Sequence, residues 1–209
     1  MAKDDLTKQD FFTSSEVDLL SETAYKKINL GKSRYSFEKH TNYALLLLLL
    51  KTGLRISEAT SLTLPQAKRG VKDGELVMVG KGGMNTKNKT KIRRFTRTVY
   101  FNSELRSIIS IYLENRRQAD SKAKTLFIGR DGQPLNKFTA WHRFKTMCRQ
   151  AGVEEKRTHA TRHTCGMNLY EKTKDILTTS SILGHKDVRT TQVYVKATKA
   201  AKRKAVELI

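Results

Sequence analysis

Residue types that suit chemistry at phosphorus are concentrated in the last fifth of the chain. The segment HATRH carries His159 and Arg162, LGHKD carries His185, and TTQVY carries Tyr194. Guanidinium groups can hold the charged oxygens of a phosphodiester, imidazoles can move or share a proton, and a phenolic hydroxyl can attack phosphorus. The combination predicts a tyrosine nucleophile that becomes covalently bonded to a phosphodiester.

The charge of the chain indicates a polyanionic partner. Its 209 residues include 41 Lys and Arg but 20 Asp and Glu, which gives a formal net charge of +21. The basic residues are spread along the whole chain, which favours a folded DNA-binding face over a polybasic membrane anchor. The leucine run 45–50 is much shorter than the roughly 20 apolar residues of a membrane span, so it predicts a core helix.

Metal binding and disulfide bonding are not expected. Cys148 and Cys165 are too few and too far apart for a disulfide framework or a zinc ribbon, and indicate two reduced thiols. His159 and His163 have the spacing of a helical zinc pair, but no HExxH motif or clustered third ligand accompanies them, and the basic surroundings repel a cation. We therefore expect no metal and no other cofactor.

The elements that must position these residues are mainly helices. We expect one from Ser14 or Ser15, and others over 37–51, from about Ser57 to a stop at Pro65, and over 103–117, 136–151, 160–171, 173–183 and 189–196, followed by a helical tail. Strands are expected over 74–80, 91–101 and 126–129. The first two strands predict a hairpin with a long basic loop.

Two features have both a structural and a functional interpretation. Arg55 lies at the junction of two expected helices, where Glu58, three residues on, could hold its guanidinium in a structural ion pair. An arginine at this junction could also project into a cleft, but taken alone the position favours the ion pair. The lysines of the hairpin loop could simply protect a solvated edge from aggregation, or could present a lysine to DNA.

The motifs taken together carry a family resemblance. TGLRISEATSL, GKGG behind a strand, HATRH, LGHKD and TTQVYV resemble the catalytic domain of the tyrosine recombinases, the lambda-integrase family that includes the Xer recombinases. The resemblance extends from about residue 11 to residue 200. The matching residues, in chain order, are Arg55, Lys81, His159, Arg162, His185 and Tyr194, and the step from His185 to Tyr194 is nine (194 − 185).

The resemblance implies both a fold and a reaction. The fold would be mainly α-helical with a small antiparallel β-hairpin, and the protein would be a site-specific recombinase that cleaves and rejoins DNA through a 3′-phosphotyrosine. Arg55 and Arg162 would grip the non-bridging oxygens and His185 would donate a further hydrogen bond. His159 would act as the base for Tyr194, and Lys81 would protonate the departing 5′ oxygen.

Other basic residues are candidate DNA contacts. They lie on the hairpin loop and on the expected helix 136–151, which could lie along or in a groove of the duplex. The set consists of Lys87, Lys89, Lys91, Arg93, Arg143 and Lys145. The three lysines among the first four also compete with Lys81 for the role of general acid.

The resemblance also suggests a domain organisation and an assembly. We expect a lead-in over 1–10, a catalytic domain over 11–196, and a C-terminal helix over 197–209 that packs in cis or on a neighbouring subunit. The N-terminal DNA-clamping domain of most members has no counterpart, as in the short recombinases that invert fimbrial gene switches, although an isolated catalytic fragment would look the same. We expect double-stranded DNA as the partner. The assembly would be a homotetramer on two DNA sites and a monomer without DNA. The protein would be cytoplasmic and nucleoid-associated, and encoded by a bacterium or a mobile element.

Two alternative functions stay open. A type IB topoisomerase-like enzyme would nick and close DNA with the same chemistry but without pairing two duplexes. A non-catalytic DNA-binding module of the same fold is the other alternative, and the presence of Tyr194 argues against it because a pure binder has no use for a nucleophile.

Overall fold

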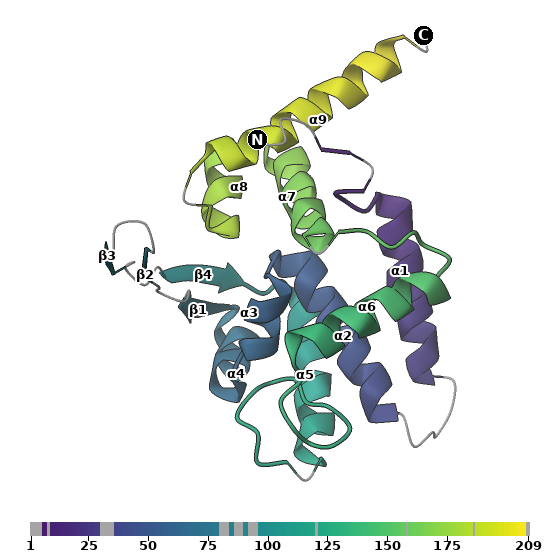
Figure 1. Cartoon of the computed structure of the whole chain (residues 1–209), viewed down its shortest axis with the longest axis vertical. Coiled ribbons are helices and arrows are strands. Elements are labelled where there is room, and N and C mark those ends of the chain that lie inside the picture. Colours follow the sequence, from purple (N-terminus) through teal and green to yellow (C-terminus); the bar gives the residue numbers. More distant parts are fainter. Residues whose placement is uncertain are drawn as a thin grey trace.

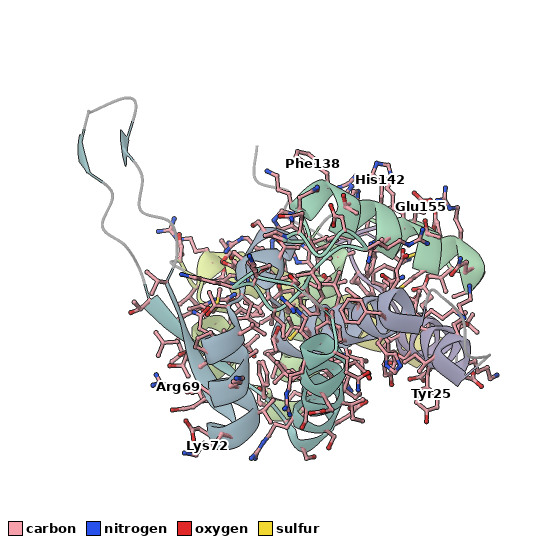
Figure 2. All side chains as sticks on the ribbon, turned by 90° about the horizontal axis from the view of Figure 1, so that it is seen from below. Tyr25, Arg69, Lys72, Phe138, His142 and Glu155 are labelled. Carbon is pink, nitrogen blue, oxygen red and sulfur yellow. The ribbon has the colours of Figure 1, made fainter. Side chains whose placement is uncertain are left out.

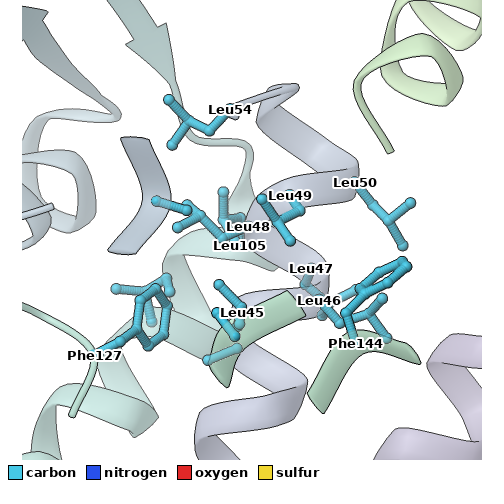
Figure 3. Close-up of a cluster of buried hydrophobic side chains, with 14 of the residues drawn as sticks. Leu45, Leu46, Leu47, Leu48, Leu49, Leu50, Leu54, Leu105, Phe127 and Phe144 are labelled. Atoms are coloured by element: carbon cyan, nitrogen blue, oxygen red, sulfur yellow. The ribbon is translucent and has the colours of Figure 1, made fainter. Parts of the chain in front are cut away.

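The leucine run forms the centre of the molecule. In the computed structural model it lies in α2 (Ser36–Thr52), where Leu45 to Leu50 are at most 5% exposed. A helix that is apolar on all sides must be covered on all sides. The covering elements include α1 (Ser14–Asn29), α5 (Ser103–Arg117), α6 (Lys137–Gln150) and α7 (Ala160–Thr173). Figure 3 shows the leucines together with Leu105, Phe127 and Phe144, and the expectation of a core helix is confirmed.

The structure describes residues 6–7, 9–29, 36–79, 84–85, 90–91, 96–119, 121–157, 159–185 and 187–207. Within them the strands form an antiparallel hairpin. Strand β1 (Glu75–Val79) pairs with β4 (Thr96–Tyr100), and the short β2 (Met84–Asn85) pairs with β3 (Thr90–Lys91). Leu76 and Val99 are paired and buried, so one face of the β1–β4 ribbon lies on the core. The mainly helical fold with a small antiparallel hairpin is therefore as predicted.

The expectation that Pro65 ends a helical segment is wrong. Helix α3 (Ile56–Ser61) ends before it, and Pro65 lies in the first turn of a further helix, α4 (Leu64–Asp73). Proline suits a first turn because its missing N–H would have no helical acceptor there. Thr63 caps α4 because its hydroxyl oxygen accepts a hydrogen bond from the Gln66 N–H, and the Gln66 side-chain oxygen in turn accepts one from the Thr63 N–H.

The expected strand over 126–129 is also wrong. In this segment the structure has only isolated bridges, between Thr63 and Thr125 and between Ile128 and Pro134. The apolar side chains of the segment are buried in the core. The Gly129 N–H donates to the Gln133 carbonyl and the Leu135 N–H to the Phe127 carbonyl, so the Ile128–Pro134 bridge is flanked by one hydrogen bond on each side.

The chain ends in three helices that carry much of the candidate site. These are α7, α8 (Ile176–Leu183) and α9 (Arg189–Val206), and α9 packs on the other two. Helix α9 is continuous across the expected boundary at residue 196, and its C-terminal half runs away from the body in Figure 1. A second, smaller apolar cluster of Cys165, Leu183 and Tyr194 joins the three helices.

One face of the molecule gathers the outermost elements. In Figure 2, helix α6 with Phe138 and His142 lies on the same side as β2 and β3, whereas Arg69, Lys72 and Tyr25 lie on the opposite side. Helix α6 also packs on α3, the helix that begins directly after Arg55. Among the described residues, no helix has the length and apolar character needed to cross a membrane.

Candidate active site

Arg55 is held by a carboxylate that is shared with a second arginine. The Arg55 backbone N–H and guanidinium donate to Glu58 at 2.8 and 3.0 Å, and Arg97 of β4 donates to Glu58 Oε2 at 2.7 Å. Burial raises the pKa of Glu58, but Arg97, Arg55 and the backbone N–H outweigh it and bring the pKa below its ordinary value. The ion pair expected between Arg55 and Glu58 is present, and it leaves the Arg55 side chain 45% exposed.

Arg162 lies at the C-terminal ends of two helices. Its guanidinium donates to the carbonyl of Gly53, just after α2, at 2.8 Å, and to that of Leu183, the last residue of α8, at 2.6 Å. Helix ends leave carbonyls without helical partners and carry partial negative charge, so they attract a cation. Arg97 also donates to the Leu183 carbonyl. Two helix ends therefore fix the Arg162 side chain, and the residue is only 4% exposed.

The two predicted histidines lie in the field of these arginines. Desolvation, Arg55 and Arg162 lower the pKa of His159, which precedes the first residue of α7. Burial, followed by Arg162 and Arg55, lowers the pKa of His185 to about 4. The His185 Nδ1 lies 2.8 Å from Thr191 Oγ1, which orients the ring. The structure thus brings Arg55, His159, Arg162 and His185 into one site.

Tyr194 lies beside this cluster but is completely covered. Its side chain on α9 is 0% exposed, and its ring centroid lies 5.9 Å from that of His163 and 6.5 Å from that of His185. Burial raises the pKa of Tyr194, which the nearby Arg162 charge opposes only in part. The phenol is therefore protonated and shielded from solvent in this structure.

Several predicted residues cannot be placed in the site. Lys81, Lys87, Lys89 and Arg93 lie outside the described residues, as does the side chain of Lys91.

On α6, both predicted DNA contacts are paired with acidic residues. Arg143 Nε lies 3.6 Å from Glu38, and its side chain is 13% exposed. Lys145 Nζ lies 2.9 Å from Glu155. The exposed positions of this helix include Lys137, Phe138, His142 and Arg149.

Two residues of the site were missed by sequence reasoning. Arg97 occupies an inward position of β4, and an arginine at a core-facing position of a strand was the available signal. His163 was considered only as part of a zinc pair with His159. In the part of the chain that the structure describes, no group of three or more potential metal ligands gathers, and His163 Nδ1 instead lies 3.3 Å from the Tyr194 hydroxyl.

Comparisons with known proteins show the family to which the chain is similar. Residues 11–201 match the family described as the Phage integrase family. The chain is 30% identical over 158 residues to tyrosine recombinase XerC of Pseudomonas savastanoi pv. phaseolicola, an alignment that covers 76% of this chain and 48% of that protein. It is 33% identical over 158 residues to tyrosine recombinase XerD of Corynebacterium glutamicum, covering 74% and 48%. The chain thus spans about half the length of these curated relatives.

Solved structures share the fold. The crystal structure of XerA recombinase matches with a TM-score of 0.70 at 22% identity, covering 95% of this chain and 64% of that chain. XerH recombinase bound to palindromic difH substrate matches with a TM-score of 0.72 at 20% identity, covering 96% and 53%. The catalytic domain of bacteriophage HP1 integrase matches with a TM-score of 0.57 at 22% identity over nearly its whole length, 95%. At these identities the likeness concerns the fold, that of a tyrosine recombinase catalytic domain.

Proposed function

The chain belongs to the phage integrase family, and on that premise we propose that it cleaves and rejoins DNA at specific sites through a bond to Tyr194. The observation that carries the proposal is the convergence of Arg55, His159, Arg162 and His185 on one site, with the Tyr194 phenol beside them. The relatives that match are recombinases, so the topoisomerase-like alternative is not favoured.

The charges of the site suit a phosphodiester under attack. Negative charge grows on the non-bridging oxygens as the phenol approaches phosphorus, and guanidinium groups can stabilise it with paired hydrogen bonds. Arg55 offers the more accessible guanidinium, at 45% exposure. Arg162 uses two N–H groups on backbone carbonyls, and a guanidinium carries five N–H donors, so in this proposal its further donors bind the phosphate.

Proton transfers complete the proposed reaction. The Tyr194 oxygen bonds to phosphorus while the bond to the 5′ oxygen breaks. His159 takes the phenolic proton, and because its pKa is lowered its ring is neutral and able to accept one. Lys81 gives a proton to the 5′ oxygen, and His185 donates a hydrogen bond to the phosphate. Rejoining is the reverse, with a 5′ hydroxyl attacking the phosphotyrosine.

We propose that the DNA lies on the face that holds α6, β2 and β3 (Figure 2). The exposed basic side chains of α6 and the hairpin residues 81–93 would contact the phosphates, and the net charge of +21 supports a polyanion there. The XerH and Tn1549 integrase structures that match are DNA complexes. A homotetramer on two duplexes, with the end of α9 packed on a neighbouring subunit, would be the active assembly.

The test begins by recovering the DNA site. DNA fragments that stay bound to the protein after denaturation would be sequenced, and a duplex with a nick beside the mapped cut would then trap the covalent complex. We expect Tyr194→Phe to abolish this complex. Tyr170→Phe, a phenol of α7 packed against the same small cluster, serves as the matched control and should leave the yield unchanged.

Two outcomes would contradict the proposal. Covalent DNA on the Tyr194→Phe protein would assign the nucleophile to another residue, and no covalent DNA on the wild type would leave only a binding protein. Exchange of flanking labels between two duplexes separates a recombinase from a nicking-closing enzyme.

A further inference from the structure

The Tyr194 ring occupies a slot that the sequence of α7 creates. A Cβ at Gly166 would lie 2.4 Å from Tyr194 Cζ and 2.7 Å from its hydroxyl oxygen, so no other residue type leaves room for the ring in this position. One turn earlier, His163 Nδ1 lies 3.3 Å from the same hydroxyl. His163 and Gly166 therefore form one face of the slot, and the His185 ring stacks on Tyr194 at an interplanar angle of 25°.

At the polar end of the slot, His163 gives the covered Tyr194 hydroxyl a hydrogen-bond partner. A buried hydroxyl without a partner is costly, and a neutral imidazole is a suitable partner because one ring nitrogen accepts while the other donates. Burial lowers the pKa of His163 and raises that of Tyr194, so both groups are neutral near pH 7 and can share a hydrogen bond. The slot is thus complementary to an intact, protonated phenol.

A phenol that is 0% exposed cannot reach a DNA phosphate. We propose that His163 is a positioning residue that, together with the space left by Gly166, holds Tyr194 in a resting position until DNA binding shifts α9. The proposal rests on the assignment of Tyr194 as the nucleophile. It assigns His163 a role that opposes the first cleavage step, distinct from the role of His159 as the base.

The first experiment needs no DNA. Tetranitromethane nitrates accessible tyrosines, and peptide mass spectrometry reads each site separately. In the wild type we expect Tyr194 to react far more slowly than Tyr25, which is 53% exposed. His163→Leu removes the hydrogen bond and should raise the Tyr194 nitration rate about five-fold, which corresponds to the ~1 kcal/mol of one neutral hydrogen bond.

Three further variants separate positioning from general loosening. His163→Gln keeps a hydrogen-bonding amide and should restore slow nitration. Gly166→Ala should expel the ring and raise nitration further. His40→Leu, a change of the same kind at a half-buried histidine of α2, should leave Tyr194 nitration unchanged. If His163→Leu and His163→Gln react alike, or if neither differs from the wild type, the proposed hydrogen bond does not hold the tyrosine.

The second experiment measures the covalent complex with nicked DNA in a single turnover. The His163→Leu protein should form it several-fold faster than the wild type, because less work is needed to release Tyr194. Slower formation would place His163 in the attack itself and overturn the resting role. Failure of the proposed function is recognised separately, since nitration of Tyr194 does not depend on any DNA cleavage.

Discussion

Glu58→Gln is the most informative single change, because Glu58 joins the accessible arginine of the site to a buried one. Its carboxylate accepts three hydrogen bonds, from the Arg55 backbone, the Arg55 guanidinium and the Arg97 guanidinium. The amide of Gln keeps one acceptor oxygen but replaces the other with an NH₂ group that faces a donor. Arg97, only 4% exposed on its side chain, then loses its counter-charge.

The size of the effect follows from this burial. Removing one partner of a buried ion pair costs about 3 kcal/mol or more, because an uncompensated charge is left behind. For a chain of this length, each kcal/mol lowers the Tm by roughly 2–4 °C, so we expect a decrease of roughly 6–12 °C. The remaining Leu183 carbonyl solvates Arg97 in part, which favours the lower end of both ranges.

Urea denaturation followed by the fluorescence of Trp141, the single tryptophan, measures the change in the free energy of unfolding. Glu114→Gln is the matched control, since Glu114 pairs with Arg117 at 63% and 77% exposure. An exposed pair of this kind contributes about 0.5 kcal/mol or less. If Glu58→Gln were no more destabilising than Glu114→Gln, the shared carboxylate would not be what holds Arg97 and Arg55, and our account of the site would be wrong.

The remaining predictions concern the other charges of the site. Arg55→Ala should reduce covalent complex formation by at least about 100-fold while changing the free energy of unfolding by less than about 1 kcal/mol. Arg162→Ala should lose the same activity and also lower the free energy of unfolding by about 3 kcal/mol, because two helix ends lose their cation. Single-turnover cleavage and urea titrations measure these two effects. Both variants should still bind DNA in a mobility-shift assay. If binding were lost in proportion to cleavage, the two arginines would only contact the DNA backbone. Since the pKa of His185 is lowered from 6.5 to about 4, the unfolded ring takes up a proton that the folded ring does not, so the free energy of unfolding should fall as the pH decreases across that window; His185→Gln should flatten this fall, and equal slopes in both proteins would contradict it. DNA affinity should decrease roughly 10³-fold or more between 50 and 200 mM salt, and a flat salt response measured by fluorescence anisotropy would contradict a phosphate-binding face.

Local signals in the sequence predicted most of the helices. The leucine run required a covered helix, and the helices expected over 103–117 and 136–151 are α5 and α6, which Asn102 and Asn136 cap. The prediction for Pro65 was wrong because a proline ends a helix when it lies in the helix interior but is compatible with a helix when it lies in the first turn. Only the capping pair of Thr63 and Gln66 distinguishes these two positions. A short apolar run such as 126–129 has the same sequence pattern whether it forms a strand or an irregular buried segment.

The site was predictable where its residues form short motifs. Arg55, Arg162 and His185 each stand in a motif whose order along the chain is specific, and the structure brings them together. Arg97 and His163 act through partners 39 and 31 residues away, Glu58 and Tyr194 respectively. No local pattern encodes such distances, because they arise only when α9 and β4 are packed against the rest of the fold.

The Leu183 carbonyl, which accepts hydrogen bonds from both Arg97 and Arg162, bears on how chimeras of such domains can be built. One backbone oxygen at the end of α8 therefore connects a strand and a helix that lie far apart along the chain. A hybrid that took residues 176–185 from one parent and residues 96–100 or 160–173 from another would combine parts that had not adapted to each other. Crossover points for a library of hybrids therefore belong outside residues 96–185, which leaves the three parts from a single parent.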